Sequence, residues 1–233
     1  MNPAPLRIDV WFWSLDLEAD EFEAVSALLS PEEHERAQRF AMPLDRRRWV
    51  ASRGRMRQIL GRITGVAPTV IAFGTEANGR PNFTHNANGL PSFNLSHSEG
   101  MAALAASYEA RIGVDIEYIR PLTLDEMAWP LSDAEQAALA TIDEPERTRA
   151  FFRYWTLKEA FIKAVGAGVS LPLEDFDISP PGVGAPRLLR LARAGHDPSR
   201  WRFAEDEPVS GYLGAVAALT DGRDIRVDWH KEC

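Results

Sequence analysis

Two acidic residues alternate with apolar ones at residues 113–117 (GVDIE), and this pattern limits what the chain around it can form. Side chains of a strand point alternately to its two faces, so Asp115 and Glu117 lie side by side on one face. Neighbouring like charges repel unless a cation or a basic group lies between them. The segment therefore predicts a strand with one apolar and one acidic face. An edge strand that turns both carboxylates to solvent is the alternative.

A second segment, residues 155–163 (WTLKEAFIK), predicts a helix that carries a third carboxylate, Glu159. Lys163 follows one turn later on the same face, as in many ordinary surface ion pairs. The aromatic and apolar residues around the pair favour burial, and a buried charge needs a partner. If this helix crosses the end of the acidic strand, three oxygen ligands and a cation converge. Such a site suits a hard cation and phosphate chemistry.

The rest of the chain predicts a mixture of helices and strands. Ser30 and Ser132 each begin a capping box, which marks the start of a helix. Longer helices are expected at about 45–63 and from about 144 to a glycine stop at 166 or 168. Alternating or apolar runs predict strands at 8–15, 69–74, 92–96, 101–107, 111–119, 201–205, 212–219 and 225–229.

A weak internal repeat suggests two lobes, and a match by composition alone between two Ala-rich strands is the alternative. With an offset of 113 residues, the segment 102–107 lies over 215–220, and Ile112, Val114 and Asp115 lie over Ile225, Val227 and Asp228. We therefore expect an α+β fold of two similar αβ lobes, with an N-terminal lobe at 1–110 and a C-terminal lobe at 111–233. The acidic pair belongs to the first copy of the repeat.

Composition excludes several classes of function. A net charge of -8 argues against bulk binding to nucleic acid or to anionic membranes, and no apolar run is long enough to span a bilayer. The N-terminus lacks the pattern of a signal peptide, and the single cysteine, Cys233, excludes an internal disulfide framework. Walker A, GxGxxG, HExxH and GxSxG motifs are absent from the sequence. These features predict a cytoplasmic protein.

Together the motifs resemble those of the surfactin-type 4'-phosphopantetheinyl transferases, the pseudodimeric class of that family. The two diagnostic motifs of the family correspond to residues 112–117 and 155–163. The stretch 166–173 is similar to its GxGLSLPL loop, 78–81 to its YGKP turn and 93–98 to its FNISHS segment. The resemblance implies two lobes of one fold in a single chain, and hence a monomer.

The resemblance also implies a metal site. Asp115, Glu117 and Glu159 would hold Mg²⁺, or Mn²⁺, against the pyrophosphate of coenzyme A. Lys163 would lie near the same pyrophosphate, with Lys158 close by.

The nucleotide half of coenzyme A would be held by residues from the first lobe. Ser96 and His97 would contact the 3'-phosphate, helped by Arg48, while Arg80 and Arg36 would lie near the phosphates. Two positions depart from the family pattern. Trp49 stands where some members have a threonine, and Glu33 where some have a lysine, so those two contacts are not carried over.

The reaction implied is attack by a serine of an acyl or peptidyl carrier protein on the β-phosphate of coenzyme A, with release of 3',5'-ADP. Glu159 is the expected general base and Asp115 the alternative, because a serine hydroxyl must lose its proton as the new bond forms. Lys163 would stabilise phosphate charge. Candidate contacts for the carrier are residues 121–131, with Leu122, Leu124, Met127 and Trp129, and the loop 166–173. For the first segment, an amphipathic helix packed on the core is the alternative.

Two other functions fit the residues less well. One is a non-enzymatic αβ protein that binds a metal or a nucleotide. The other is a different Mg²⁺-dependent phosphotransferase with another pyrophosphate donor. The presence of both Glu159 and Lys163 favours the transferase, because a binding protein needs neither a base nor a third ligand.

Overall fold

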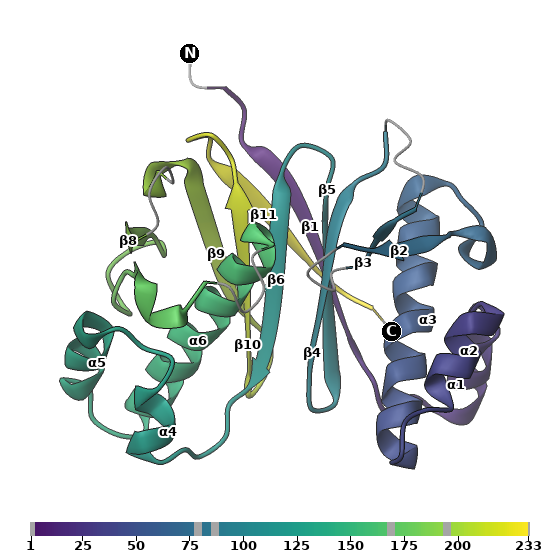
Figure 1. The fold of residues 1–233 in the computed structure, drawn as a ribbon, viewed down its shortest axis with the longest axis horizontal. Helices are drawn as coiled ribbons and strands as arrows, with labels where there is room; N and C mark the ends of the chain where they lie inside the picture. Colours follow the sequence, from purple (N-terminus) through teal and green to yellow (C-terminus); the bar gives the residue numbers. More distant parts are fainter. Residues whose placement is uncertain (1–2, 77–80, 85–88, 167–170, 193–196, 233) are drawn as a thin grey trace.

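The computed structural model describes residues 3–76, 81–84, 89–166, 171–192 and 197–232. Two β-sheets pack against each other in the middle of the molecule, and helices cover their outer faces (Figure 1). The first sheet has the strand order β11-β1-β5-β4, and the second has the order β6-β10-β9. None of the helices within the described ranges is long and apolar enough to cross a membrane.

The first half of the chain supplies most of the first sheet and the helices that cover it. Its elements are β1 (Leu6–Ser14), α1 (Ala19–Ser26), α2 (Pro31–Ala37), α3 (Pro43–Thr64), β2 (Phe73–Thr75), β3 (Pro81–Phe83), β4 (Ser92–Ser98) and β5 (Met101–Ser107).

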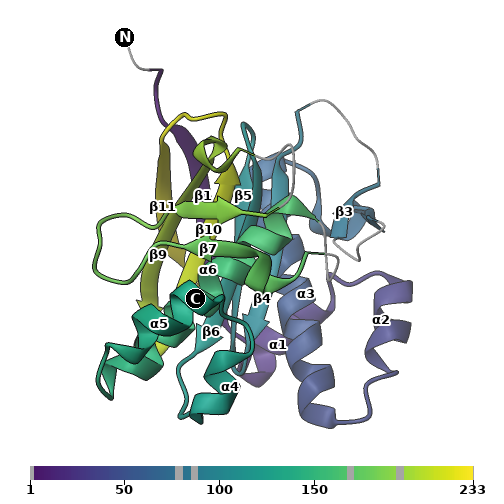
Figure 2. The same ribbon diagram turned by 60° about the vertical axis from the view of Figure 1, so that its left-hand side comes forward.

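The second half supplies the second sheet, its helices and the last strand of the first sheet. Its elements are β6 (Arg111–Tyr118), α4 (Leu124–Ala128), α5 (Asp133–Ala140), α6 (Glu146–Val165), β7 (Phe176–Ile178), β8 (Leu188–Leu191), β9 (Trp201–Val209), β10 (Tyr212–Leu219) and β11 (Ile225–Lys231). Helices α4 and α5 and strand β7 surround α6 on the side away from α3 (Figures 1 and 2).

Strand β1 is apolar on both faces because it lies between two cores. Ile8 and Val10 face the second sheet and belong to the core between the sheets. Trp11 and Trp13 point the other way, into the core under α3. In β6, Ile112, Val114 and Ile116 likewise fill the core between the sheets. Alternation then turns Asp115 and Glu117 toward the opposite side, where α6 lies.

The two copies of the internal repeat cross between the sheets in opposite directions. Strand β5 belongs to the first sheet and β6 to the second, whereas β10 belongs to the second and β11 to the first. The last strand, β11, runs parallel to β1, from the pair Leu6–Ile225 to the pair Phe12–Lys231. The sheet that contains the N-terminal strand is therefore completed by the C-terminal end of the chain.

The helix ends follow the predicted local signals. Ser30 and Ser132 close complete capping boxes with Glu33 and Glu135. Gly166 ends α6 in the left-handed conformation, with φ of 72°, which glycine adopts without steric cost. A third capping box, at Thr123, begins the short helix α4.

Candidate active site

Strand β4, at the edge of the first sheet, lies beside β6, at the edge of the second, and Asp115 lies at this junction. Its side chain is buried, with only 2% of the residue exposed. The Ser96 hydroxyl donates to Asp115 Oδ1 at 2.7 Å, and Lys163 Nζ donates to the same oxygen at 2.6 Å. Lys163 Nζ also donates to Ser96 Oγ at 2.8 Å. The structure thus brings a strand carboxylate, a helix lysine and a hydroxyl from the other sheet into one cluster.

Glu117, two residues further along β6, has donors on both of its carboxylate oxygens. The Ser98 hydroxyl donates to Oε2 at 2.7 Å, and the Trp155 indole N–H donates to Oε1 at 2.9 Å. Ser98 Oγ accepts the Tyr118 N–H at 3.2 Å, so its own proton is committed to Glu117. These donors fix the orientation of the carboxylate.

Ser98 and Trp155 were not predicted as site residues. A signal for Ser98 exists, because it follows Ser96 by two residues on a strand. The same spacing separates Asp115 and Glu117 on β6. Two hydroxyls therefore face two carboxylates across the junction. Trp155 opens the second diagnostic motif, but the motif gave no indication that its indole N–H would donate to Glu117.

Glu159 reaches the same region from α6. Burial raises the pKa of Glu159, and the charges of Asp115 and Glu117 raise it further, while Lys163 acts in the opposite direction. Burial and the Asp115 charge also raise the pKa of Glu117. The three carboxylates therefore lie within electrostatic range of one another, in a setting that disfavours three negative charges.

Helix α6 approaches β6 so closely because Gly113 has no side chain. A Cβ at this position would lie 2.1 Å from the Ala160 carbonyl oxygen and 2.4 Å from the Ala164 nitrogen. Arg111, at the start of β6, donates from Nε to the Ala164 carbonyl at 2.7 Å. The glycine of the first motif thus lets the helix of the second motif lie directly on the acidic strand.

A hard cation fits the chemistry of this donor set, although the side chains as they stand do not form a closed metal cage. Across the part of the chain that the structure describes, no three carboxylate, histidine or cysteine groups gather closely enough to hold a metal ion. However, Asp115 Oδ2 is buried and has no hydrogen-bond partner among the described residues. Such an oxygen is costly to leave unsatisfied, and a cation would satisfy it.

The residues predicted to hold the nucleotide lie around the β4 end of the site. Arg48, on α3, pairs with both carboxylate oxygens of Asp16 at 2.8 Å and lies 3.9 Å from Glu99 Oε2, on the β4–β5 turn. His97 is exposed on β4, and desolvation by the neighbouring protein and the Lys163 charge lower the pKa of its imidazole. Arg80 lies outside the described residues.

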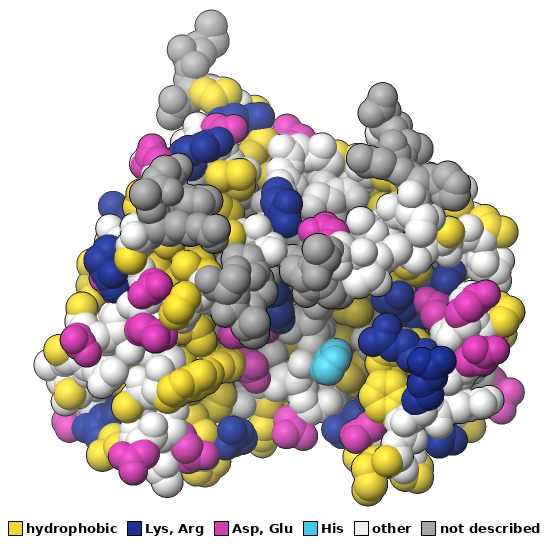
Figure 3. All heavy atoms as spheres, viewed as in Figure 1, with side chains coloured by type: hydrophobic (Ala, Val, Ile, Leu, Met, Phe, Trp, Pro, Cys, Tyr) yellow, Lys and Arg dark blue, Asp and Glu magenta, His cyan; other side chains and the backbone are white. Residues whose placement is uncertain are grey.

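The basic residues of α2 and α3 lie beside this end of the site. Arg36 is exposed on α2 and its guanidinium lies 5.7 Å from the centre of the Trp49 ring. Basic side chains gather over α2 and α3 on the face drawn in Figure 3. Glu33, which stands where some family members have a lysine, is buried and accepts from Arg53 at 2.7 Å and Arg57 at 2.6 Å. Its role here is structural, because it joins α2 to α3.

Two predicted residues are not where they were expected. Lys158 was predicted to lie beside the coenzyme A phosphates, but its side chain is fully buried on the α5 side of α6. Met127 was predicted to face a carrier protein, but it is 2% exposed and packs in the core around α6. Trp129 and Leu124 of the same segment are exposed, at 74% and 64%.

Comparison with known proteins identifies the family. The model of the 4'-phosphopantetheinyl transferase superfamily matches residues 111–217, and that of the 4'-phosphopantetheinyl transferase N-terminal domain matches residues 14–109. The chain is 35% identical to the 4'-phosphopantetheinyl transferase HetI of Nostoc sp. over 228 residues, covering 96% of this chain and 92% of that protein.

Two relatives come from Bacillus subtilis. One, named 4'-phosphopantetheinyl transferase, is 33% identical over 214 residues, covering 90% of this chain and 92% of the relative. The other, 4'-phosphopantetheinyl transferase Sfp, is 33% identical over 164 residues, covering 70% of this chain and 71% of Sfp.

The fold and these matches define a transferase with an α+β architecture built from an N-terminal and a C-terminal domain. The chain belongs to the 4'-phosphopantetheinyl transferase superfamily. It transfers the 4'-phosphopantetheine arm of coenzyme A to a serine of a carrier protein.

Proposed function

We propose that the transfer takes place at the junction of β4, β6 and α6, with Mg²⁺ held by Asp115, Glu117 and Glu159. The observation that carries this proposal is the buried, unpartnered Oδ2 of Asp115, beside two further carboxylates. Carboxylate oxygens are the ligands that Mg²⁺ prefers, and Mn²⁺ accepts the same set. When bound, the ion would neutralise pyrophosphate charge. Glu159, whose carboxylate accepts no hydrogen bond from a described residue, would turn toward Asp115 to complete the site.

Glu159 acts as the general base in this proposal, and Asp115 is the alternative. The O–H bond of the carrier serine breaks as its oxygen bonds to the β-phosphorus of coenzyme A. The bond from that phosphorus to 3',5'-ADP breaks at the same time. Glu159 suits the proton transfer because its raised pKa makes it a stronger base than an ordinary glutamate. It also accepts no hydrogen bond from a described residue, whereas Asp115 Oδ1 already accepts two.

The positive charges near the junction would hold the phosphates of coenzyme A. Lys163 lies at the acidic cluster itself, so it would contact the pyrophosphate. Ser96 and His97 on β4, Arg48 on α3 and Arg36 on α2 would hold the nucleotide phosphates, as would Arg80. We leave Lys158 out of this set because its ammonium is buried away from the cluster.

An acyl or peptidyl carrier protein would present its serine from the side of α4. A groove beside Glu117 is lined by Leu122, Trp129, Phe151 and Trp155. The exposed Trp129 supplies apolar contact area, which matters because the net charge of -8 gives poor long-range attraction to an acidic carrier.

Mass spectrometry of the intact carrier protein tests this site. An apo carrier incubated with coenzyme A, Mg²⁺ and the parent enzyme should gain one phosphopantetheine, and EDTA should prevent the gain. Asp115→Asn should abolish transfer. The matched control is Asp228→Asn, at the equivalent position of the second repeat copy, where the carboxylate pairs with Arg7 and Arg226 instead. Equal transfer rates in both variants would contradict the site.

A further inference from the structure

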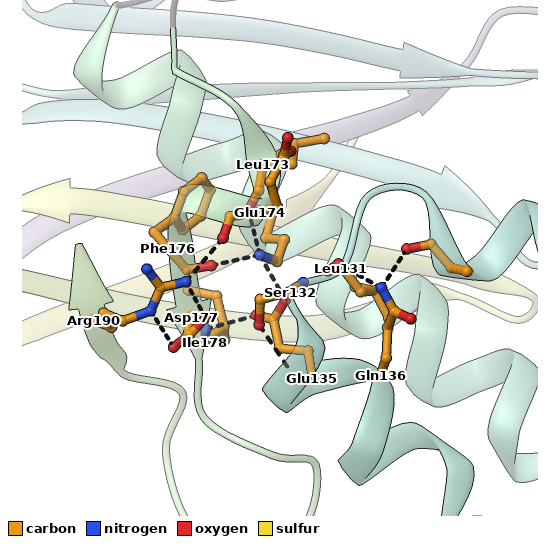
Figure 4. Close-up of polar contacts among 12 residues, drawn as sticks. Leu131, Ser132, Glu135, Gln136, Leu173, Glu174, Phe176, Asp177, Ile178 and Arg190 are labelled. Carbon is orange, nitrogen blue, oxygen red and sulfur yellow. Dashed lines mark hydrogen bonds and ion pairs between the residues drawn. The ribbon is translucent and has the colours of Figure 1, made fainter. Parts of the chain in front are cut away.

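Lys158 belongs to the second motif, yet its ammonium group lies inside the protein. The residue is 0% exposed. Nζ donates to the carbonyl oxygens of Leu173 and Phe176, both at 2.7 Å, and lies 2.6 Å from Glu135 Oε2 (Figure 4). An ammonium group has three N–H donors, and three acceptors surround this one. No donor is left over for a ligand phosphate.

Glu135 is equally engaged on the other side of the pair. Its Oε1 accepts the backbone N–H of Ile178 at 2.8 Å, and its Oε2 accepts the N–H of Ser132 at 3.0 Å in the capping box of α5. The carboxylate is 2% exposed. The Lys158–Glu135 pair therefore joins three parts of the fold: α6, the start of α5, and the segment from Leu173 to Ile178.

The direction of Lys158 on the helix separates it from the reactive residues. At 3.6 residues per turn, its side chain leaves α6 about 100° from Glu159 and about 140° from Lys163. Glu159 and Lys163 face β6, where the bare backbone at Gly113 contacts the helix. Lys158 points instead toward α5 and the segment from Leu173 to Ile178. Helix α6 is thus fixed by direct contact with β6 on one side and by the buried ion pair on the other.

We propose that Lys158 is a positioning residue that sets the rotation and depth of α6, and thereby the places of Glu159 and Lys163. It does not bind coenzyme A. The effect on catalysis rests on the proposed role of Glu159, whereas the burial of Lys158 does not depend on that role. The pair acts as a unit, because removing one charge leaves the other buried without a partner.

Chemical labelling of the native enzyme tests the first part of the proposal without any substitution. The sequence has three lysines, at positions 158, 163 and 231. Brief treatment with acetic anhydride, followed by peptide mass spectrometry, should label Lys163 and the exposed Lys231 but not Lys158. Coenzyme A with Mg²⁺ should protect Lys163 alone, and denaturant should expose Lys158.

Labelling of native Lys158 at a rate like that of Lys231, with protection by coenzyme A, would overturn the proposal. Protection of neither Lys158 nor Lys163 would count against the proposed coenzyme A site, while an unlabelled Lys158 would still support its buried position. The labelling experiment can therefore contradict the buried position of Lys158 and the proposed coenzyme A site independently of each other.

Two variants test the positioning role. Lys158→Met leaves the Glu135 carboxylate buried and unpaired, so its Tm should fall. Below that Tm, kcat should drop by about tenfold, because proton transfer by Glu159 depends on close placement of its carboxylate. The Kd for coenzyme A should rise by less than the tenfold expected for Lys163→Met, because the flexible lysine side chain can still reach the pyrophosphate. Lys158→Met/Glu135→Gln removes both charges and should recover part of the lost Tm and kcat, because no buried charge is left unpaired although one acceptor oxygen is lost.

The positive control is Lys163→Met, which should weaken coenzyme A binding by about tenfold with little change in Tm. A folded double variant that binds coenzyme A tenfold more weakly than the parent would overturn the proposal. An unchanged kcat for folded Lys158→Met would also overturn it, because the pair would then only stabilise the fold. If the double variant does not fold, labelling of the parent enzyme still decides whether Lys158 is accessible to coenzyme A.

Discussion

Asp115 shows how the site works at the scale of single residues. One carboxylate oxygen accepts from Ser96 and Lys163, while the other is buried without a donor. A residue arranged this way is incomplete by itself, which is the expected state of a group that receives a ligand. Glu117 differs, because Ser98 and Trp155 already satisfy both of its oxygens. These donors would orient Glu117 for a metal, as outer hydrogen bonds generally do.

The raised pKa of Glu159 predicts a conflict between activity and stability. Since burial and the neighbouring carboxylates raise this pKa, the ionised side chain destabilises the folded state at neutral pH. Glu159→Gln should therefore increase the free energy of unfolding at pH 7, as measured by urea denaturation. The gain should shrink as pH falls through the raised pKa and vanish below about 4.5, the ordinary value.

The matched control lies on the same helix. Glu146→Gln, at an exposed position in the first turn of α6, removes a charge that favours the helix N-terminus. It should lower the stability by about 0.3–1 kcal/mol at pH 7. A Glu159→Gln protein that loses stability as Glu146→Gln does would show that Glu159 is not under electrostatic strain.

Periodicity predicted some residue positions and missed others. Strand alternation alone put Asp115 and Glu117 on one face. Helix periodicity separates Lys158 from Lys163, but the partner of Lys158 could not be inferred. Glu135 comes from a different helix, and only the tertiary packing of α5 on α6 brings it within 2.6 Å. The family resemblance assigned Lys158 to coenzyme A because it directly precedes Glu159 in the sequence. Neighbouring residues on a helix point in directions about 100° apart, so this proximity does not place Lys158 at the site.

At the scale of elements, the contact of α6 with β6 is what assembles the site. Gly113→Ala should force the helix away from the strand, because the new Cβ would lie 2.1 Å from the backbone oxygen of Ala160. Overpacking of this kind costs about 1–3 kcal/mol. We expect a lower unfolding midpoint in urea and a fall in kcat, because Lys163 and Glu159 move with the helix.

The reference for this variant is Gly222→Ala, in the turn before β11, where a Cβ meets nothing within 4 Å. That glycine has φ of 89°, so its substitution strains only the local backbone. It should lower stability and leave the kcat of the folded enzyme unchanged. Unchanged kcat in folded Gly113→Ala as well would mean that the helix–strand contact does not position the reactive residues.

The elements themselves were largely predictable, because local signals specify them. The capping boxes at Ser30 and Ser132 start helices, and the glycine at 166 ends one, as expected. The pairing of strands was less predictable. The two strands of each repeat copy are joined by short turns, which usually indicates a hairpin. Instead they enter different sheets, because the apolar faces of β5 and β6 pack against each other across the central core.

At the scale of the whole molecule, the two halves of the sequence are intertwined. The last strand, β11, completes the sheet of the first half, and the central core draws side chains from both sheets. The lobe boundary at 110/111 stays a proposal. It falls inside the first repeat copy, between β5 and β6, and it leaves β11 in the sheet of the first half.

Separate expression of residues 1–110 and 111–233 should therefore give two poorly folded fragments. The first fragment would expose the edge of β1 and the apolar face of its sheet, and both features promote aggregation. Circular dichroism and size-exclusion chromatography of each fragment, alone and mixed, would measure this. Cooperative unfolding of either fragment alone would contradict the description of a shared core.

The rate of phosphopantetheine transfer by Glu159→Gln is the decisive measurement for the role of Glu159 as the general base. Intact-mass time courses would follow the carrier protein at saturating coenzyme A and Mg²⁺. Thermal unfolding and coenzyme A binding would be measured on the same preparation. We expect a folded variant that binds coenzyme A but transfers about 10²–10⁴-fold more slowly than the parent. A transfer rate near that of the parent enzyme would contradict the assignment of Glu159 as the base.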